Sequence, residues 1–445
     1  MQQIAVCLIV DISTRKQRLT TLQKVAHHLE DGYLCNSMGK VLTFLTGRIK
    51  QKKRLNTIFV QEPVRPIWMH CASLGEFEQG RPLLEAFREQ YPDTKILLTF
   101  FSPSGYEIQK STPWADYVFY LPIDTPRNAR RFLDNIQPKA AVFIKYEFWY
   151  FYLTGLKKRN IPTYLVSARF RPGQPFFKRY GIAFRKMLTC FTHIFVQDDR
   201  SLRLLETLQT DYPPVTVAGD TRFDRVTRAA EKDGTPEELK QLFKKPLLLA
   251  GSTWPQDYKL LKQLAQDCPQ LQIVIAPHEI HPATRQTLQR FFKPLEPVFY
   301  SDCKLQKHVT DKHKQKQTRT AEVDFKQTLI IDRMGILSSA YRHATLCYIG
   351  GGFHKAGIHN VLEPAVYGKT LLFGPHYHKS KEAEDLIHLG AAQCVIDYNS
   401  LLTAVNHWLE QTKEREKAES TAKEYVHQHT GATHLILKTM ADRVP

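Results

Sequence analysis

Apolar and polar positions alternate along most of the chain in a pattern of short strands and helices. From about residue 66 onward, apolar runs are separated by segments whose apolar residues recur at helical spacing. Residues 96–101 are typical of a buried strand, and Leu83, Leu84 and Phe87 before it predict a helix that begins near Arg81. Further strands are predicted at 139–144, 162–167, 193–197 and 215–218. This alternation indicates a parallel sheet with helices on both faces.

A second series of candidate strands begins at Pro246. Its members lie at 247–250, 271–276, 328–331, 345–349, 370–373 and 393–396. The charged segment 229–245, which contains Gly234-Thr235-Pro236, separates the two series and is interpreted as an interdomain linker. We therefore expect an α/β protein of two doubly wound parallel-sheet domains facing a cleft, with ligands bound at the carboxyl ends of the strands.

The composition excludes several classes of protein. The 445 residues are 42% hydrophobic and 24% charged, which argues against wholesale disorder, collagen and a polytopic membrane protein. The eight cysteines form no C-x-x-C pair, so neither a disulfide framework nor a cysteine zinc site is expected, and a reducing compartment fits. The net charge of +18 indicates an anionic partner: nucleic acid, an acidic membrane surface or a phosphorylated substrate.

Two segments fall outside the strand and helix pattern. Residues 1–60 are basic, and five Lys and Arg residues lie in the run 48–54. This segment is either a solvated arm or an electrostatic contact with anionic lipid headgroups, worth about 1 kcal/mol per basic residue. Residues 301–322 are rich in Lys, His, Gln and Thr and predict a solvated loop.

Two acidic residues follow predicted strands of the first series. Glu76 comes after Ser73-Leu74-Gly75, where it would act as a general base on a hydroxyl, or would only begin a helix and complement its dipole. Glu147 lies in Lys145-Tyr146-Glu147, where it is either a site carboxylate or one half of a surface ion pair.

Two further strand ends suggest anion binding. Arg222, in Gly219-Asp220-Thr221-Arg222, would contact a phosphate or carboxylate, or form a local salt bridge beside a helix cap. Ser252 and Thr253 follow Gly251 at the first strand end of the second series, where a helix N-terminus can bind an anion. No Gly-Lys-Ser/Thr follows, so this segment is not a Walker A loop.

The glycine-rich segment 350–364 is the strongest motif of the second series. Gly350, Gly351 and Gly352 close a strand and would let backbone N–H groups approach phosphate oxygens. A helix is predicted to begin near His359, which would place Asn360 and Glu363 on one face and let Glu363 accept both hydroxyls of a ribose. The alternative is a tight turn before a capped helix. His354, His359, His376 and His378 lack the spacing of metal ligands, so no metal is expected.

Taken in order, these segments resemble the 3-deoxy-D-manno-octulosonic acid (Kdo) transferases of lipopolysaccharide biosynthesis. Their residues are most similar to those of the Bacteroidetes branch of that family. The likeness covers about residues 65 to 410. Its further matching segments are Ala276-Pro277-His278-Glu279, Met334-Gly335-Ile336-Leu337 and Gly374-Pro375-His376. Each segment alone is weakly specific, but the ordered series is specific.

The resemblance implies a glycosyltransferase B fold, with transfer of Kdo from CMP-Kdo to a lipid A precursor (lipid IVA), inversion, and no cofactor or catalytic metal. It implies that Glu76 is the general base and that Glu147 and Arg222 stabilise the transition state. The residues expected to hold the CMP-Kdo donor are Pro277, His278, Met334, Gly335, Ile336, Asn360, Val361, Leu362 and Glu363, together with Ser252, Thr253, Gly351 and Gly352.

The resemblance also implies domains and a location. We expect a basic membrane-associating segment at 1–60, an acceptor-binding domain at 61–235, a CMP-Kdo-binding domain at 236–425 and a carboxyl-terminal helix at 426–445. The protein would lie peripherally on the cytoplasmic face of the inner membrane, with CMP-Kdo, the lipid A precursor and the anionic surface as partners.

The chain departs from the family pattern in ways that leave alternatives open. Many members carry Arg where this chain has His278, and Glu where it has Lys145 and Ile336. Residues 1–46 do not form the usual apolar anchor. Another enzyme of this fold that uses a UDP-sugar is the main alternative. A nucleic-acid-binding protein is disfavoured, because no zinc finger, RRM or KH signature is present.

Overall fold

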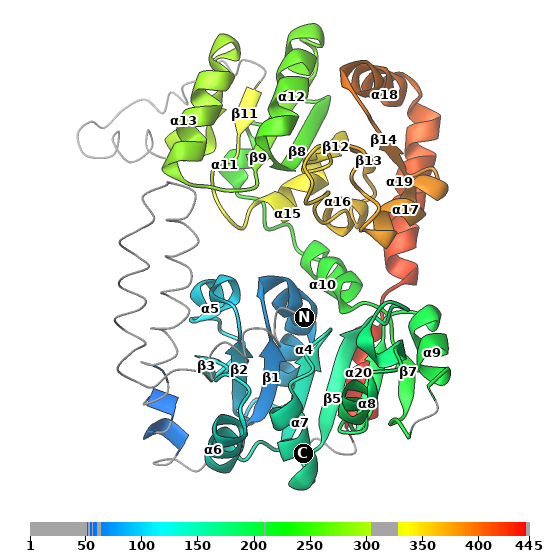
Figure 1. Cartoon of the computed structure of the whole chain (residues 1–445). Helices are drawn as coiled ribbons and strands as arrows, with labels where there is room; N and C mark the ends of the chain where they lie inside the picture. Colours follow the sequence, from blue (N-terminus) through cyan, green and yellow to red (C-terminus); the bar gives the residue numbers. More distant parts are fainter. Residues whose placement is uncertain are drawn as a thin grey trace, which may run out of the picture. The chain divides into compact units, whose positions relative to one another are not determined.

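The computed structural model describes residues 51, 54, 55, 57–59, 64–208, 211–303 and 328–441. Most of the basic run 48–54 and of the loop predicted at 301–322 lies outside these residues. The chain forms two compact units (Figure 1). Unit 1 comprises Met1–Asp224 and Gly431–Pro445, and unit 2 comprises Arg225–Thr430.

Unit 1 contains a seven-stranded parallel sheet in the order β3-β2-β1-β4-β5-β6-β7. Its strands are β1 (Ile67–Cys71), β2 (Ile96–Phe100), β3 (Tyr117–Tyr120), β4 (Ala140–Ile144), β5 (Thr163–Ala168), β6 (His193–Val196) and β7 (Val215–Val217). Its main helices are α4 (Leu74–Gln90), α5 (Pro103–Gln109), α6 (Pro126–Ile136), α7 (Tyr150–Lys158), α8 (Ile182–Leu188), α9 (Asp199–Glu206) and α20 (Ala432–Met440). Helix α10 (Thr221–Ala230) begins in unit 1 and ends in unit 2.

Unit 2 contains a second seven-stranded parallel sheet, in the order β10-β11-β9-β8-β12-β13-β14. Its strands are β8 (Leu247–Thr253), β9 (Gln272–Pro277), β10 (Val298–Phe299), β11 (Thr328–Ile330), β12 (Leu346–Ile349), β13 (Thr370–Phe373) and β14 (Ala392–Cys394). Its helices include α11 (Glu237–Lys240), α12 (Pro255–Asp267), α13 (Pro282–Phe291), α15 (Leu337–Ala340), α16 (Leu362–Ala365), α17 (Lys381–His388), α18 (Tyr398–Glu410) and α19 (Thr412–Gln428). The two sheets confirm the predicted α/β class.

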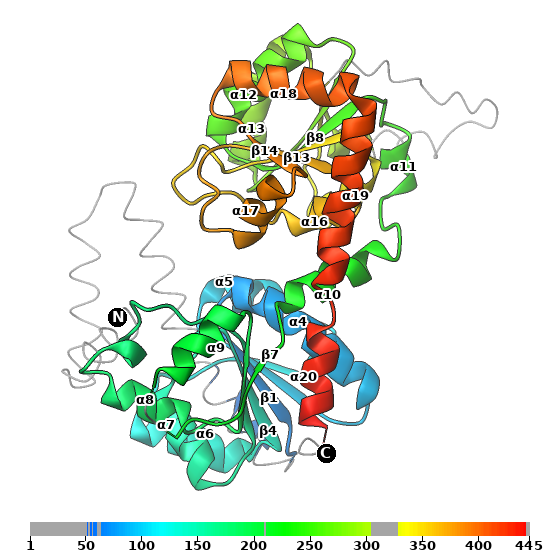
Figure 2. The ribbon, with the colours of Figure 1, turned by 90° about the vertical axis from the view of Figure 1, so that its right-hand side faces the viewer.

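Both faces of the unit 1 sheet are buried, which explains why its strands are continuous apolar runs. Side chains that alternate along a strand enter different cores. Trp68 joins the core that α6 and α7 cover, whereas its neighbours Ile67 and Met69 join the core that α4 covers. Helix α20 adds Ile436 and Met440 to this second core, and Figure 2 shows it against the sheet of unit 1.

Helix α4 begins at Leu74, seven residues before the predicted start. Gly75, Gly80 and Pro82 conceal this start in the sequence, because glycine and proline lower helix propensity. Packing around Gly80 is tight, because a Cβ there would lie 3.0 Å from the sulfur of Met69. The early start places the whole first turn of α4 beside the carboxyl end of β1.

Across the residues that the structure describes, no helix combines the length and the apolar character needed to cross a membrane.

Candidate functional site

Glu76 lies in the first turn of α4, directly after the carboxyl end of β1. Ser73 precedes the helix in an extended conformation, and its backbone N–H donates to Oε2 of Glu76 at 2.8 Å. The Ser73 hydroxyl donates to the same oxygen. Glu76 therefore makes the contact at the start of the helix that was the alternative interpretation of its position in the sequence. This contact orients a half-buried carboxylate at the edge of the sheet where a ligand would bind.

Glu147 lies three residues beyond β4 and is 2% exposed. Its Oε2 accepts a hydrogen bond from the indole N–H of Trp149 at 2.7 Å and lies 3.1 Å from Nε2 of His70. The surface-pair interpretation of this residue is therefore wrong. A carboxylate this deeply buried requires donors, and the indole and imidazole supply them.

His70 connects Glu147 to the neighbouring strand β2. Its Nδ1 lies 2.9 Å from Oγ1 of Thr99, which also accepts from the indole of Trp68 at 2.8 Å. The same nitrogen lies 3.1 Å from the backbone carbonyl oxygen of Thr99. The buried chain of contacts from Thr99 through His70 thus holds the imidazole in place against Glu147.

The thiol of Cys71 shows that Glu76 and Glu147 share one neighbourhood. Cys71 is the last residue of β1 and is fully buried. Burial raises the pKa of its thiol well above the usual value, and the charges of Glu76, Glu147 and Glu78 raise that pKa further. Because β1 and β4 are hydrogen-bonded neighbours, the segments that follow them meet at one edge of the sheet. The structure therefore brings the two site carboxylates together.

Arg222 is paired within its own motif. Its Nε and Nη2 donate to Oδ2 of Asp220 at 3.0 and 2.7 Å. Asp220 also accepts from the amides of Gln79 at 3.3 Å and Gln197 at 3.0 Å, so it joins the start of α10 to α4 and to the end of β6. This is the local salt bridge that the sequence left as an alternative. The side chain of Arg222 still keeps 29% of its surface exposed.

In unit 2 the glycine-rich segment brings three strand ends into backbone contact. A Cβ on Gly350 would lie 2.4 Å from the carbonyl oxygen of Ser252, and one on Gly352 would lie 2.4 Å from the backbone nitrogen of Gly374. Gly351 has a φ of +91°, which favours glycine. These positions therefore admit no larger side chain without a backbone shift.

Two glycine amides that were expected to face a phosphate are occupied within the protein. Gly350 N–H donates to the carbonyl of Gly251 at 2.9 Å, and Gly351 N–H donates to Oδ2 of Asp257 at 3.1 Å. Asp257 is buried in the first turn of α12 and also accepts from the hydroxyl of Tyr348 at 2.8 Å. The glycines therefore allow close backbone packing. The carboxylate of Asp257 accepts the N–H of Gly351 that was expected to bind a phosphate.

The segment after the glycines is less helical than predicted. Helix α16 contains only four residues and begins at Leu362 rather than near His359. Asn360 lies before it, and its Oδ1 accepts from the N–H of Leu362 at 3.1 Å. Asn360 and Glu363 therefore do not share a helical face. Val361 immediately precedes the helix, and Glu363 lies 4.0 Å from Nη1 of Arg225.

The remaining predicted donor-site residues lie at three loops. Ser252 has a φ of +53°, Thr253 is buried, and the N–H of His278 donates to the carbonyl of Thr253 at 3.0 Å, next to Pro277. These contacts join the ends of β8 and β9. A separate loop beyond β11 contains Met334, Gly335 and Ile336, with Met334 77% exposed and Gly335 at φ +82°.

Four aromatic rings also meet at the carboxyl ends of β8, β9 and β12. Trp254 stacks on His278 and His354, with centroids 4.8 and 4.5 Å apart, and His278 stacks on His359 at 4.2 Å. We call these four residues the ring stack. The sequence singled out the histidines one at a time but did not connect them with Trp254. The available signal was that each ring follows a predicted strand.

Burial in the ring stack disfavours the charged form of its innermost imidazole. Burial lowers the pKa of His359 to about 4, and the nearby His278 and His354 act in the same direction. Partial burial also lowers the pKa of His278, although Glu279 opposes this effect. Burial therefore disfavours the charged forms of both His359 and His278.

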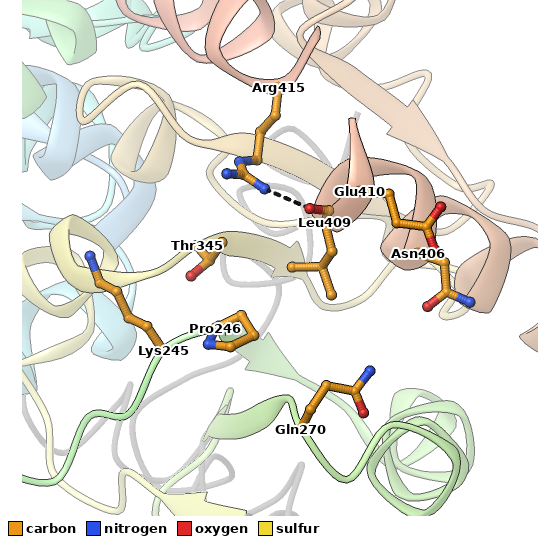
Figure 3. A pocket seen from close by; sticks show the side chains of 8 residues that line it. All are labelled: Lys245, Pro246, Gln270, Thr345, Asn406, Leu409, Glu410 and Arg415. Carbon is orange, nitrogen blue, oxygen red and sulfur yellow. Dashed lines mark hydrogen bonds between the residues drawn. The ribbon is translucent and has the colours of Figure 1, made fainter. Parts of the chain in front are cut away.

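A different hollow in unit 2 lies away from these residues. It measures about 550 Å³ and is found near the amino ends of β8, β9 and β12 (Figure 3). Its lining consists of Lys245, Pro246, Gln270, Thr345, Asn406, Leu409, Glu410 and Arg415. Ligands of doubly wound sheets bind at the opposite, carboxyl ends, and no predicted site residue lines this hollow.

Within the described ranges, no group of three or more His, Cys, Asp or Glu side chains is arranged to hold a metal ion.

Comparisons with known proteins connect these residues to one group of enzymes. Residues 45–225 match the family described as 3-Deoxy-D-manno-octulosonic-acid transferase (kdotransferase). The chain is 27% identical to the 3-deoxy-D-manno-octulosonic acid transferase of Haemophilus influenzae, over 84% of this chain and 86% of that protein. It is 25% identical to the transferase of the same name from Aquifex aeolicus, over 78% and 87%. These matches confirm the resemblance found in the sequence motifs.

Solved structures confirm the fold. A putative UDP-N-acetylglucosamine 2-epimerase from Listeria monocytogenes has a TM-score of 0.53 and 12% identity, over 84% of this chain and 95% of that one. The UDP-GlcNAc 2-epimerase of Methanocaldococcus jannaschii has a TM-score of 0.51 and 14% identity, over 81% and 98%. At this identity the likeness concerns the glycosyltransferase B fold alone.

Proposed function

We propose that this enzyme, a glycosyltransferase related to the Kdo transferases, moves Kdo from CMP-Kdo to a lipid A precursor such as lipid IVA, with inversion and release of CMP. One observation carries the proposal: Glu76 and Glu147 meet at the carboxyl ends of the adjacent strands β1 and β4. A transfer to an alcohol needs a base for the hydroxyl and a charge that stabilises the transition state, and these carboxylates meet both needs.

Glu76 is proposed as the general base. The alcohol of the acceptor is a weak nucleophile, so a positioned carboxylate that takes its proton lowers the barrier. Both contacts from Ser73 go to Oε2 and hold the carboxylate at the helix start. Glu76 is also half-exposed, which lets a hydroxyl from outside reach it.

Glu147 and Arg222 are proposed to stabilise charge as the donor's glycosidic bond breaks. The sugar acquires positive character in an oxocarbenium-like transition state, which a fixed carboxylate stabilises. Glu147 is fixed by its bonds with His70 and Trp149. Arg222 is held by Asp220 and carries the positive charge that a carboxylate or phosphate of the donor requires.

Unit 2 is proposed to hold the donor nucleotide without a metal or cofactor. The predicted residues lie at the carboxyl ends of its sheet, where doubly wound proteins bind ligands. Ser252 and Thr253 precede the 13-residue helix α12, whose N-terminus favours an anion. Met334 presents an exposed apolar side chain that suits a nucleobase.

We propose the cytoplasmic surface of the inner membrane as a further partner, since the acceptor is a lipid. A surface of unit 1 supports this proposal: residues 169–186, which we call the basic aromatic segment. It contains six Lys and Arg residues and no Asp or Glu. Tyr180 and Ile182 are 72% and 71% exposed within it. Exposed cations beside an exposed tyrosine and isoleucine suit an anionic lipid interface.

The test is CMP release from CMP-Kdo, measured with and without a tetra-acylated lipid A precursor. The proposal requires release that depends on the acceptor. A binding panel with CMP and UDP accompanies it, because preference for UDP would support the alternative UDP-sugar enzyme. Absence of CMP release together with UDP preference would overturn the proposal.

A further inference from the structure

The ring stack contains two histidines whose tautomers are fixed by neighbours. The indole N–H of Trp254 donates to Nε2 of His359 at 3.0 Å. The backbone N–H of Ala356 donates to Nδ1 of His354 at 3.2 Å. Both donors can only donate, so both accepting nitrogens are unprotonated. His359 therefore carries its proton on Nδ1 and His354 carries its proton on Nε2.

His278 differs from these two histidines. In the described part of the chain, no hydrogen-bond donor fixes its ring nitrogens, and the residue is partly exposed to solvent. The charged or titratable groups that act on it are Glu279 on its own loop and His359 across the stack. Behind the stack, His354 interacts with the buried carboxyl of Asp257. His278 is thus the imidazole of the stack that can accept a proton without losing a bond seen here.

We propose that the ring stack binds the phosphate of the donor nucleotide, with His354 and His359 as neutral N–H donors and His278 taking up a proton as the nucleotide binds. The inference rests on the proposed function, since that function supplies the nucleotide. It adds Trp254, His354 and His359 to the donor site and makes donor binding depend on pH.

Three observations carry the inference. The amides of Gly350 and Gly351 are occupied, so these two donors do not serve a phosphate, whereas the fixed tautomers leave one N–H each on His354 and His359. The face of Trp254 against His278, 4.8 Å away, can stabilise an imidazolium by a cation–π interaction. Finally, the lowered pKa of His278 leaves it mostly neutral before an anion arrives. Binding of an anion reverses that balance and draws in a proton.

Isothermal titration calorimetry of the full chain tests this proton uptake. The ligand is the methyl ester of CMP, because CMP itself has a phosphate ionisation near pH 6 that would obscure the result. Titrations in two buffers of different ionisation enthalpy at pH 6, 7 and 8 give the protons taken up per nucleotide. We expect net uptake, with affinity that rises by up to about tenfold per pH unit as the pH falls.

Variants of His278 and Trp254 test whether His278 is the group that takes up the proton. His278→Arg supplies a permanent charge, so it should bind the ester with neither proton uptake nor pH dependence. Trp254→Phe keeps an aromatic ring but lacks the N–H that fixes His359, so uptake should increase. His388→Gln, at an exposed histidine at the end of α17, is the matched control and should behave like the parent chain.

The outcomes separate this inference from the proposed function. Ester binding without proton uptake, or uptake that persists in His278→Arg, overturns the inference even if Kdo transfer is observed. Proton-linked binding that is equally strong for uridine monophosphate methyl ester supports the ring stack and counts against CMP-Kdo as the donor. Failure of both esters to bind overturns the inference, while the CMP-release assay still decides the reaction.

Discussion

The candidate residues of unit 1 are held by polar partners, whereas in the ring stack of unit 2 burial disfavours the charged forms of His278 and His359. Glu147 accepts from an indole and an imidazole, and Arg222 is paired with Asp220. In unit 2 one ring nitrogen each of His354 and His359 accepts a hydrogen bond, and burial lowers the pKa of His359. Fixed charges suit the chemical step, since they need no rearrangement as the reaction proceeds. Groups that can titrate suit a site whose charge changes when an anionic ligand enters and leaves.

The largest expected effect is on turnover in unit 1. Glu76→Gln should lower kcat by about 10²–10⁴-fold, because an amide cannot accept the proton of the acceptor. Glutamine can still accept the N–H of Ser73, so the helix start should survive. Initial rates of CMP release and thermal unfolding measure the two effects. Ser73→Ala, which disturbs the helix start but keeps the base, is the control, and equal rate losses in both variants would argue against a general base.

A second change weakens the fixed network behind Glu147. His70→Ala removes one donor from a carboxylate that is 2% exposed, so the free energy of unfolding should fall by about 3 kcal/mol. Urea titration measures this loss. His193→Ala is the comparison, because His193 lies on β6 and forms a hydrogen bond with the hydroxyl of Thr216. Equal losses of unfolding free energy in the two variants would show that the contact between His70 and Glu147 adds no stability beyond that of the contact between His193 and Thr216.

The third prediction concerns the stability of unit 2 against pH. The pKa of His359 is about 4 in the folded chain, below its ordinary value of 6.5, so folding favours the neutral ring. The stability from this residue is therefore complete above pH 6.5 and is lost as the pH falls toward 4, by at most about 3 kcal/mol. Urea unfolding between pH 4 and 7 should show this slope, and His359→Asn should flatten it. If the free energy of unfolding of His359→Asn changed with pH as it does in the parent chain, then a group other than His359 would cause the pH dependence.

The smallest expected effect is on membrane binding by the basic aromatic segment. Replacing Tyr180 and Ile182 together with serine should weaken binding to anionic vesicles by about tenfold, because two exposed apolar side chains no longer enter the interface. Co-sedimentation with vesicles that contain phosphatidylglycerol measures the loss. Ile108→Ser is the control, since Ile108 is 60% exposed on α5 of the same unit. If the control variant weakened vesicle binding equally, then any exposed apolar side chain of unit 1 would have the same effect, and the basic aromatic segment would have no particular role.

Much of the fold follows from the sequence because most strands are buried on both faces. Strands such as β4, in which every side chain is buried, are unbroken apolar runs in the sequence. The strands that escaped prediction are β3, whose first two residues are only half-buried, and β10, which has two residues. Both lie at sheet edges, where the apolar signal is weak.

The candidate site was less predictable, because its contacts join distant segments. The sequence identified Glu147 but not its bond to His70, which lies 77 residues away. Likewise, Trp254 and His359 are 105 residues apart. Each residue lies at or beyond the end of a strand, and only the order of strands in the sheet determines which strand ends become neighbours. Motif spacing alone therefore finds candidates without their partners.

Unit 1 is built from two separate stretches of the chain, because the chain leaves it after Asp224 and returns to it at Gly431. A reading frame that stopped at Thr430 would encode all of unit 2 but would remove Ile436 and Met440 from the core of unit 1. The two ends of this interruption are already adjacent, since Asp224 accepts the backbone N–H of Gly431 at 2.5 Å. A short peptide that joins Asp224 directly to Gly431 would therefore excise unit 2 and leave unit 1 as one continuous polypeptide for expression by itself.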